Sequence, residues 1–237
     1  MYNVAAIISG RGSTFMAFYE RCQKGLLPGV NPRLLISTTS KAKGLEFARN
    51  AGFPSQNIIL SQKSHFSDDL ARGQAILTHC RARDIQLIVM MGCLMIMPEN
   101  VLDAILTLNQ HPARTPEFGG MDGLTVHRAV INFARAINRP FVTEPTVHLA
   151  TKELDLGPIV GVRLVPVHIN DTPESLDDRV ILVEHELVQT TIYLFSQGKV
   201  GIYERTQRLI QHSDEEHMLA EAVAEAKLWA EQRKAGQ

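Results

Sequence analysis

Short apolar runs alternate with longer amphipathic stretches through the first half of the chain. Five apolar runs have the length and composition of buried strands: residues 4–8, 34–37, 58–60, 85–90 and 105–108. Three stretches between them carry apolar residues at helical spacing: residues 14–24, 43–51 and 67–83. This alternation predicts an α/β fold with a doubly wound, mostly parallel sheet, in which ligands bind beyond the carboxyl ends of the strands.

The pattern changes in the second half of the chain. Residues 113–123 contain three glycines and one proline, which predicts a loop. A helix is then predicted over 126–136, strands over 141–150 and 159–166, and a closing helix over 177–195. We assign these elements, together with those of the first half, to one domain over residues 1–205.

The residues after 205 predict one further helix. Apolar side chains recur at helical spacing from Leu219 to Trp229, and Arg233 and Lys234 follow near the end of the stretch. We expect residues 206–237 to form a helical extension that docks on the domain through this stripe. A contact between two copies of the chain is the alternative, so we expect a monomer or a homodimer.

Composition and charge narrow the classes of function. The 237 residues are 45% hydrophobic and 21% charged, with a formal net charge of −1, which gives no reason to expect a nucleic-acid or membrane partner. No basic stretch precedes the first apolar run, and the longest apolar run, residues 87–97, is too short to span a bilayer. We therefore expect a cytoplasmic protein that binds small molecules. Three widely spaced cysteines and no histidine pair at ligand spacing predict neither a disulfide framework nor a bound metal.

Asn109 and His111 are candidate catalytic residues. They follow the apolar run at 105–108, and residues two apart on an extended segment point to the same side. An amide that donates to an oxyanion and an imidazole that moves a proton suit acyl transfer, and a carboxylate such as Asp155 can hold the imidazole in one state. A lone buried histidine or a turn aspartate is more often structural. No serine or cysteine has the setting of a nucleophile, so we expect direct transfer to a bound amine.

A glycine turn, Ser9-Gly10-Arg11-Gly12-Ser13-Thr14, separates the first predicted strand from the first predicted helix. Backbone N–H groups at such a helix N-terminus bind anions, and the hydroxyls of Ser13 and Thr14 add donors. The turn matches neither the dinucleotide-binding motif nor the Walker loop. A plain tight turn with Thr14 as N-cap explains the same residues equally well.

Three motifs follow one another along the chain: Asn109-Gln110-His111-Pro112, Val147-His148 and Glu153-Leu154-Asp155-Leu156-Gly157-Pro158. In this order and spacing they resemble the formyltransferases that use 10-formyltetrahydrofolate, and most closely those that act on glycinamide ribonucleotide in purine biosynthesis. The similarity extends from about residue 3 to about residue 200. It implies the Rossmann-like fold of that family and transfer of a formyl group from 10-formyltetrahydrofolate, as co-substrate, to the amine of glycinamide ribonucleotide, without a metal.

The resemblance also implies roles for individual residues. Asn109 and a protonated His111 would stabilise the oxyanion, and Asp155 would support the charge on His111. Four residues would bind the acceptor, the first three at its phosphate and the last at its ribose: Gly12, Ser13, Thr14 and Glu184. Six would bind the folate: Lys63, Leu94, Met95, Ile96, Met97 and Asn109.

The chain departs from the family around the acceptor amine. Residues 113–116 replace the usual Ser-Leu-Leu-Pro, Thr125 replaces the first of two usual histidines, and Leu156 replaces a usual glycine. Another small amine, such as an amino sugar or hydroxyornithine, is therefore an alternative acceptor. A formyltetrahydrofolate hydrolase and a non-catalytic folate- or phosphate-binding module are further alternatives, and the near-neutral charge disfavours a methionyl-tRNA formyltransferase.

Overall fold

Seven strands form one sheet in a computed structural model that describes residues 1–93 and 95–235. In sheet order they are β3 (Ile58–Leu60), β2 (Val30–Ser37), β1 (Tyr2–Ile8), β4 (Leu87–Met90), β5 (Leu106–His111), β7 (Thr146–Leu149) and β8 (Ile159–Val162). The first five are parallel, β7 is antiparallel to β5, and β8 is antiparallel to β7. The predicted doubly wound, mostly parallel sheet is confirmed.

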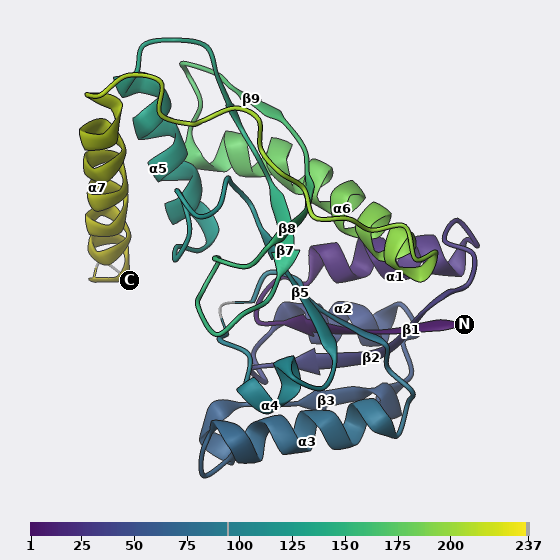
Figure 1. Cartoon of the computed structure of the whole chain (residues 1–237). Coiled ribbons are helices and arrows are strands. Elements are labelled where there is room, and N and C mark those ends of the chain that lie inside the picture. The colour runs from purple at the N-terminus through teal and green to yellow at the C-terminus, as the bar shows by residue number, and fades with distance from the viewer. Residues whose placement is uncertain (94, 236–237) are drawn as a thin grey trace.

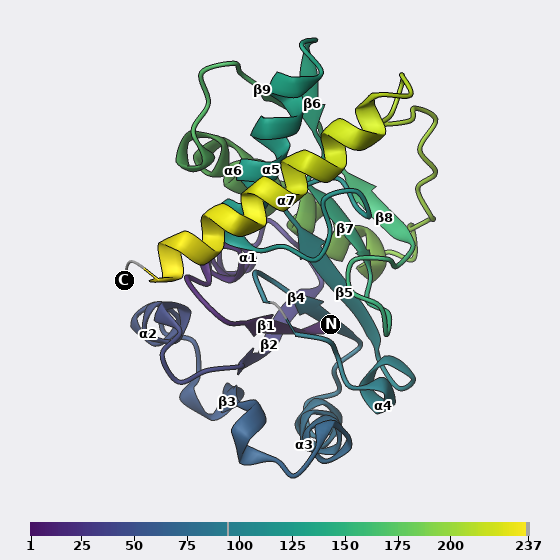
Figure 2. The same cartoon turned by 90° about the vertical axis from the view of Figure 1, so that its left-hand side faces the viewer.

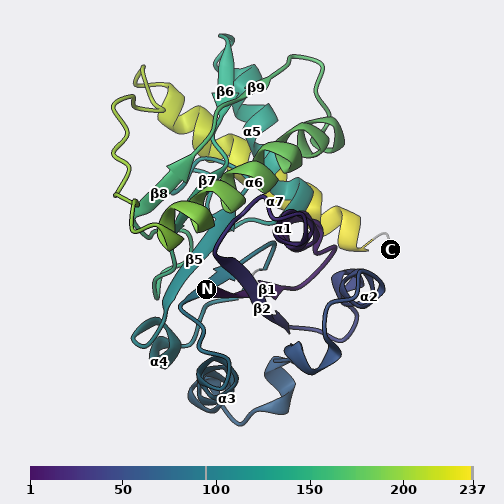
Figure 3. The same ribbon diagram turned by 90° about the vertical axis from the view of Figure 1, so that its right-hand side faces the viewer.

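Helices cover both faces of this sheet (Figures 1 and 3). On one face lie α1 (Ser13–Gln23), α2 (Lys43–Asn50) and α6 (Pro173–Ser196). On the other lie α3 (Asp69–Arg81) and α4 (Glu99–Leu102). Side chains of β1 alternate between the two cores, with Ile8 in the first and Ile7 in the second. No helix in the described ranges is both long and apolar enough to cross a membrane.

A second group of elements packs to one side of the sheet around a core of its own. It comprises α5 (Gly123–Ala136), the start of α6, the two-stranded sheet of β6 (Phe141–Thr143) and β9 (Val165–Val167), and α7 (Glu215–Ala235). The predicted strands over 141–150 and 159–166 are wrong in extent, because each divides between the two sheets. Pro145 follows β6 and has no N–H for a sheet ladder, which explains the first of these breaks.

The C-terminal helix docks on its own chain. α7 lies along α5 (Figure 2), where Ala222 and Ala226 are buried. Farther along α7, the Trp229 ring lies under two guanidinium groups, with Cζ of Arg128 on α5 at 5.8 Å and Cζ of Arg233 at 4.7 Å from its centroid. The predicted C-terminal helix is confirmed, and its small apolar residues form the contact with α5.

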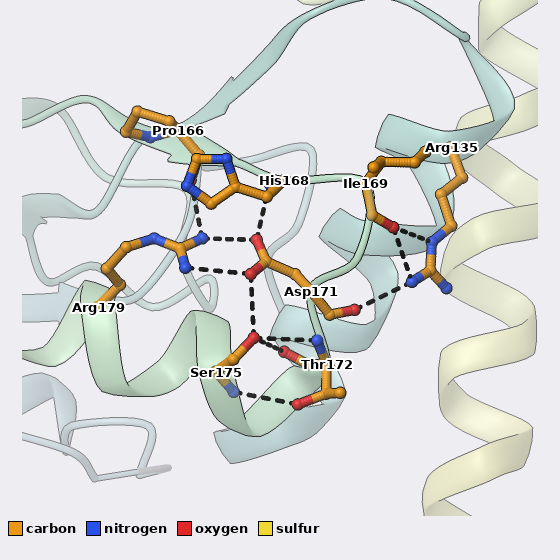
Figure 4. Close-up of polar contacts among 8 residues, drawn as sticks. All are labelled: Arg135, Pro166, His168, Ile169, Asp171, Thr172, Ser175 and Arg179. Atoms are coloured by element: carbon orange, nitrogen blue, oxygen red, sulfur yellow. Dashed lines mark hydrogen bonds and ion pairs between the residues drawn. The ribbon is translucent and has the colours of Figure 1, made fainter.

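A polar cluster fixes the start of α6 (Figure 4). Thr172 is the N-cap, and its hydroxyl accepts from the Ser175 N–H while the Ser175 hydroxyl accepts from the Thr172 N–H. The Asp171 carboxylate just before the cap binds the Arg179 guanidinium in the second turn. The helix therefore begins at Pro173, four residues before its predicted start. This anchoring sets the direction in which α6 runs past the carboxyl ends of the strands.

Candidate active site

A cavity of about 560 Å³ opens at the carboxyl ends of β1, β4 and β5. Its walls come from the turn after β1, the segment after β4, the end of β5, the start of α5 and one face of α6. Cavities of this size are typical of small-molecule sites. Its place follows from the topology, because β1 and β4 flank the point at which the strand order reverses.

Three predicted residues meet at one side of this cavity. Asn109 Nδ2 donates to Asp155 Oδ1 at 2.9 Å, and His111 Nδ1 lies 3.4 Å from Asp155 Oδ2. The Gly120 N–H also donates to Asp155 Oδ2, at 2.8 Å. All three side chains are buried. Asn109 and His111 lie within β5, so the strand extends beyond its predicted end at residue 108, and the two residues share a face because they are two apart.

The turn between β7 and β8 presents Asp155 to β5. Asp155 adopts the left-handed backbone conformation with φ 57°. Two residues later, a Cβ on Gly157 would lie 1.7 Å from the Leu149 carbonyl oxygen, so only glycine allows the turn to close on β7. Burial alone would raise the pKa of the Asp155 carboxyl, but its imidazole neighbours and the Gly120 N–H outweigh burial and lower it. Asp155 is therefore a carboxylate at neutral pH.

His111 is held as a neutral imidazole. Its Nε2 lies 2.9 Å from the Phe118 carbonyl oxygen, which can only accept, so Nε2 carries the proton. Burial lowers the pKa of His111 by more than the Asp155 carboxylate raises it. Nδ1, on the Asp155 side, is then the free basic nitrogen. The expectation of a protonated His111 rests on the charge of Asp155, and the direction of the pKa shows that burial opposes that charge.

The Asn109 amide is engaged by two side chains. Besides Asp155, its Nδ2 lies 3.3 Å from His148 Nε2. His148 Nδ1 donates to the Leu149 carbonyl at 2.9 Å, and its Nε2 also lies 3.4 Å from Asp155 Oδ1. Both amide hydrogens therefore have a neighbour, whereas Asn109 Oδ1 has no partner within the described residues. The contact with His148 is the longer and weaker of the two.

The predicted anion-binding turn lines the same cavity. Gly12 is the N-cap of α1, with φ 70°, and no side chain caps the helix. A Cβ on Gly12 would lie 2.7 Å from Gly44 Cα, so glycine is required where α1 and α2 begin side by side. Ser13 and Thr14 fill the first two positions of the helix and line the cavity. The alternative with Thr14 as N-cap is wrong, and the first N–H groups of α1 stay free of side-chain caps.

Glu184 reaches the cavity from α6. It is buried, and its Oε1 has no hydrogen-bond partner among the residues described. Burial raises the pKa of its carboxyl to about 7. Since unpaired buried polar atoms are costly, an acceptor oxygen left free in a cavity indicates a place for a ligand donor.

Glu184 should make the stability of the protein depend on pH. Between its ordinary pKa of about 4.5 and its folded value of about 7, the folded chain keeps a proton that the unfolded chain has lost. The proton on Glu184 therefore stabilises the folded chain fully at low pH. This stabilisation, about 3 kcal/mol, is lost as the pH rises through 7. Relative to Glu184→Gln, the wild-type free energy of unfolding in urea should therefore fall between pH 5 and pH 8. Parallel pH profiles for the two proteins would contradict this prediction.

Sequence reasoning missed a charged cluster in the cavity. Arg11 Nη2 donates to Asp177 Oδ2 at 2.9 Å, and His127 Nε2 lies 3.3 Å from Asp177 Oδ1. All three residues line the cavity. His127 stands three and four residues before Val130 and Ile131, on the buried stripe of α5. That spacing is the signal by which it could have been found.

The predicted folate-binding residues do not all lie at one site. Met95 and Met97 are buried and Ile96 is 60% exposed, and all three line a hollow of about 10 Å³ beside Asn109 and Asp155. That volume holds at most one water molecule, so a pterin would enter only after side chains there have moved. Leu94 lies outside the described residues. Lys63 lines neither the cavity nor the hollow, and its ammonium lies 3.4 Å from the Asp69 carboxylate on the surface.

The thiols are not set up as nucleophiles. Cys93 lines the cavity, but its Sγ is buried and accepts from the Ser9 hydroxyl at 3.0 Å, and burial raises its pKa. Burial likewise raises the pKa of Cys22 and of Cys80 to about 12. Throughout the described part of the chain, no group of three or more His, Cys, Asp or Glu side chains is arranged to hold a metal ion.

Comparison with known proteins gives consistent results. The formyl transferase family model matches residues 2–192. A phosphoribosylglycinamide formyltransferase from Vigna unguiculata, described as chloroplastic, is 32% identical over 201 residues, which cover 83% of this chain and 62% of the relative. The chain thus spans less than two thirds of that relative. The phosphoribosylglycinamide formyltransferase of Escherichia coli is 28% identical over 85% of this chain and 91% of its own length. A crystal structure of glycinamide ribonucleotide transformylase 1 from Symbiobacterium toebii matches with a TM-score of 0.74 and 28% identity, covering 86% of this chain and 95% of that one.

Proposed function

The chain belongs to the formyl transferase family, and from this premise we propose that it transfers a formyl group from 10-formyltetrahydrofolate to the amine of glycinamide ribonucleotide. The observation that carries the proposal is the meeting of Asn109, His111 and Asp155 in one cavity with an uncapped helix N-terminus. The first three would act on the formyl group and the amine. The helix N-terminus would bind the phosphate of the acceptor.

His111 would act as the general base and then as the general acid. As the amine nitrogen bonds to the formyl carbon, the carbonyl electron pair moves to oxygen, and the amine proton passes to His111 Nδ1. Asp155 stabilises the imidazolium that results. The oxygen electron pair then re-forms the carbonyl as the bond between the formyl carbon and the donor nitrogen breaks, and that nitrogen keeps the electron pair of the broken bond and receives the proton from His111. No external base and no covalent enzyme intermediate are needed.

Asn109 would hold the developing charge on the formyl oxygen. One of its amide hydrogens is fixed on Asp155, and the other makes only the longer contact with His148. The second hydrogen is therefore the one that is available to an oxyanion. Through its first hydrogen, the same amide also holds the Asp155 carboxylate in place.

The remaining predicted residues would divide between the two substrates. We assign the acceptor phosphate to Gly12, Ser13 and Thr14, and a ribose hydroxyl to the unpartnered oxygen of Glu184. The folate supplies an activated formyl group, and its pterin would bind along residues 95–97, a segment in no helix or strand that lines the hollow beside Asn109. The exposed position of Lys63 gives no support for a contact there.

One assay tests the proposed reaction. Purified protein with 10-formyl-5,8-dideazafolate should release the deformylated folate, measured by absorbance, only when glycinamide ribonucleotide is present. Release without any acceptor would indicate a hydrolase, and absence of release with any acceptor would favour a non-catalytic binding module. Mass spectrometry should detect the formylated ribonucleotide.

A second candidate acceptor is a small amine without a phosphate. Of the described residues that line the cavity, Arg11 is the one arginine and none is lysine, whereas four carry carboxyl groups: Asp122, Asp155, Asp177 and Glu184. Because Arg11 is already paired with Asp177, the lining favours a cation over a dianion. In the same assay, turnover with amino sugars and no response to glycinamide ribonucleotide would establish this acceptor class.

A further inference from the structure

The segment between α6 and α7 is bound to the loop that follows β5. Arg205 Nε donates to Glu144 Oε2 at 2.6 Å, and the other oxygen of Glu144 accepts from Arg114 Nη1. Arg114 Nη2 in turn donates to the Gln207 carbonyl at 2.9 Å. The side chains of Arg114, Glu144 and Arg205 are only 8%, 13% and 13% exposed, so these contacts are largely shielded from water. A paired network of this kind fixes geometry, whereas exposed ion pairs contribute little.

The loop leads directly to the catalytic groups. Arg205 Nη1 donates to the Thr115 carbonyl, and the Phe118 N–H donates to the Arg114 carbonyl at 2.9 Å. The Phe118 carbonyl then accepts the proton on His111 Nε2. Farther along the loop, the Gly120 N–H holds Asp155. The same short loop therefore receives the Arg205 contact at one end and sets the positions of both catalytic side chains at the other.

An apolar contact reinforces the polar one. Phe118 is fully buried in the second core, which also contains Leu209 from the connecting segment and Ala222 and Ala226 from α7. The segment and α7 lie beyond residue 192, where the match to the family model ends. This part of the chain therefore contributes contacts behind the catalytic loop that the matched region does not itself supply.

We propose that Arg205 is a positioning residue, through which the connecting segment holds loop 113–120 in the geometry that His111 and Asp155 require. The kinetic part of this proposal rests on the proposed function, whereas the structural part does not. Arg205 lines no part of the cavity and touches neither His111 nor Asp155. Its effect would pass through the backbone of the loop.

Kinetics of three variants test the proposal. Arg205→Ala should lower kcat by about 10- to 100-fold, as expected for a displaced catalytic group, with a smaller change in KM. Arg205→Lys should recover part of the loss in kcat, because lysine still places a positive charge beside the Glu144 carboxylate but cannot also reach the Thr115 carbonyl. Arg208→Ala is the matched control, since Arg208 is exposed in the same segment and has no polar contact with described residues. Equal kcat values for Arg205→Ala and Arg208→Ala would overturn the proposal.

Hydrogen exchange gives a readout that does not depend on activity. In Arg205→Ala, amides of residues 113–122 should exchange at least about tenfold faster than in Arg208→Ala, while those of β1 and β4 stay unchanged. This result would support the positioning role even if the wild-type protein failed to transfer a formyl group. Unchanged exchange in the loop, or a uniform rise throughout the chain, would refute it.

Discussion

Replacing His111 with alanine is expected to lower kcat for formyl transfer by about 100- to 10,000-fold, the range that general acid–base groups contribute. The reason is the state of the ring, whose Nε2 proton is committed to Phe118 and whose Nδ1 is left free to accept the amine proton beside Asp155. Alanine leaves no group that can take its place. Steady-state rates with saturating folate analogue and acceptor would measure the loss.

A loss of activity must be separated from a loss of fold. His217→Ala is the matched control, because this histidine is exposed on α7 and pairs with Glu221 on the same helix. Its kcat should equal that of the wild type. The thermal unfolding of His111→Ala should still be cooperative, with the far-UV spectrum unchanged. Turnover of a folded His111→Ala protein within about threefold of wild type would contradict the mechanism.

The positions of Asn109 and His111 followed from the sequence because they depend on local pattern. The apolar run before Asn109 places it near the carboxyl end of a buried strand, and the spacing to His111 puts both on one face. The sequence indicated Asp155 as their partner only through the order of the three motifs. No short-range pattern indicates that a turn 46 residues later contacts this strand.

The protonation states could not be predicted in the same way. The pKa of His111 depends on the depth of burial and on a carbonyl from the loop at Phe118, and both are products of the whole fold. The same holds for Glu184, whose pKa is raised by a burial that no local pattern reveals. Local patterns give the identity of these groups, while the surrounding protein decides their charge.

The start of α6 was also predicted wrongly, although the sequence contains a pattern that indicates it. The capping box of Thr172 and Ser175, with Pro173 at the first position, indicates where α6 begins, yet apolar periodicity alone set the start too late. The divided strands illustrate a different difficulty, because the two short pieces on either side of Pro145 belong to different sheets. Which sheet a three-residue strand joins is decided by long-range packing.

Asp155→Asn should lower kcat by about 100- to 1,000-fold, although it is nearly isosteric. Asparagine tolerates the left-handed backbone at this position, so the turn should survive. Both carboxylate oxygens, however, face donors, one from Asn109 and one from Gly120. An amide must therefore turn its NH2 toward one of them, which breaks a hydrogen bond and removes the charge that stabilises the protonated His111.

The pH profile of the residual activity would identify the cause. Because the Asp155 carboxylate raises the pKa of His111, its removal should move the acid limb of kcat to lower pH. Asp103→Asn, at an exposed position after α4, should change neither the rate nor the profile. A folded Asp155→Asn protein that keeps the wild-type acid limb would show that the carboxylate does not govern the charge on His111, and the division of labour between the two residues would then have to be reassigned.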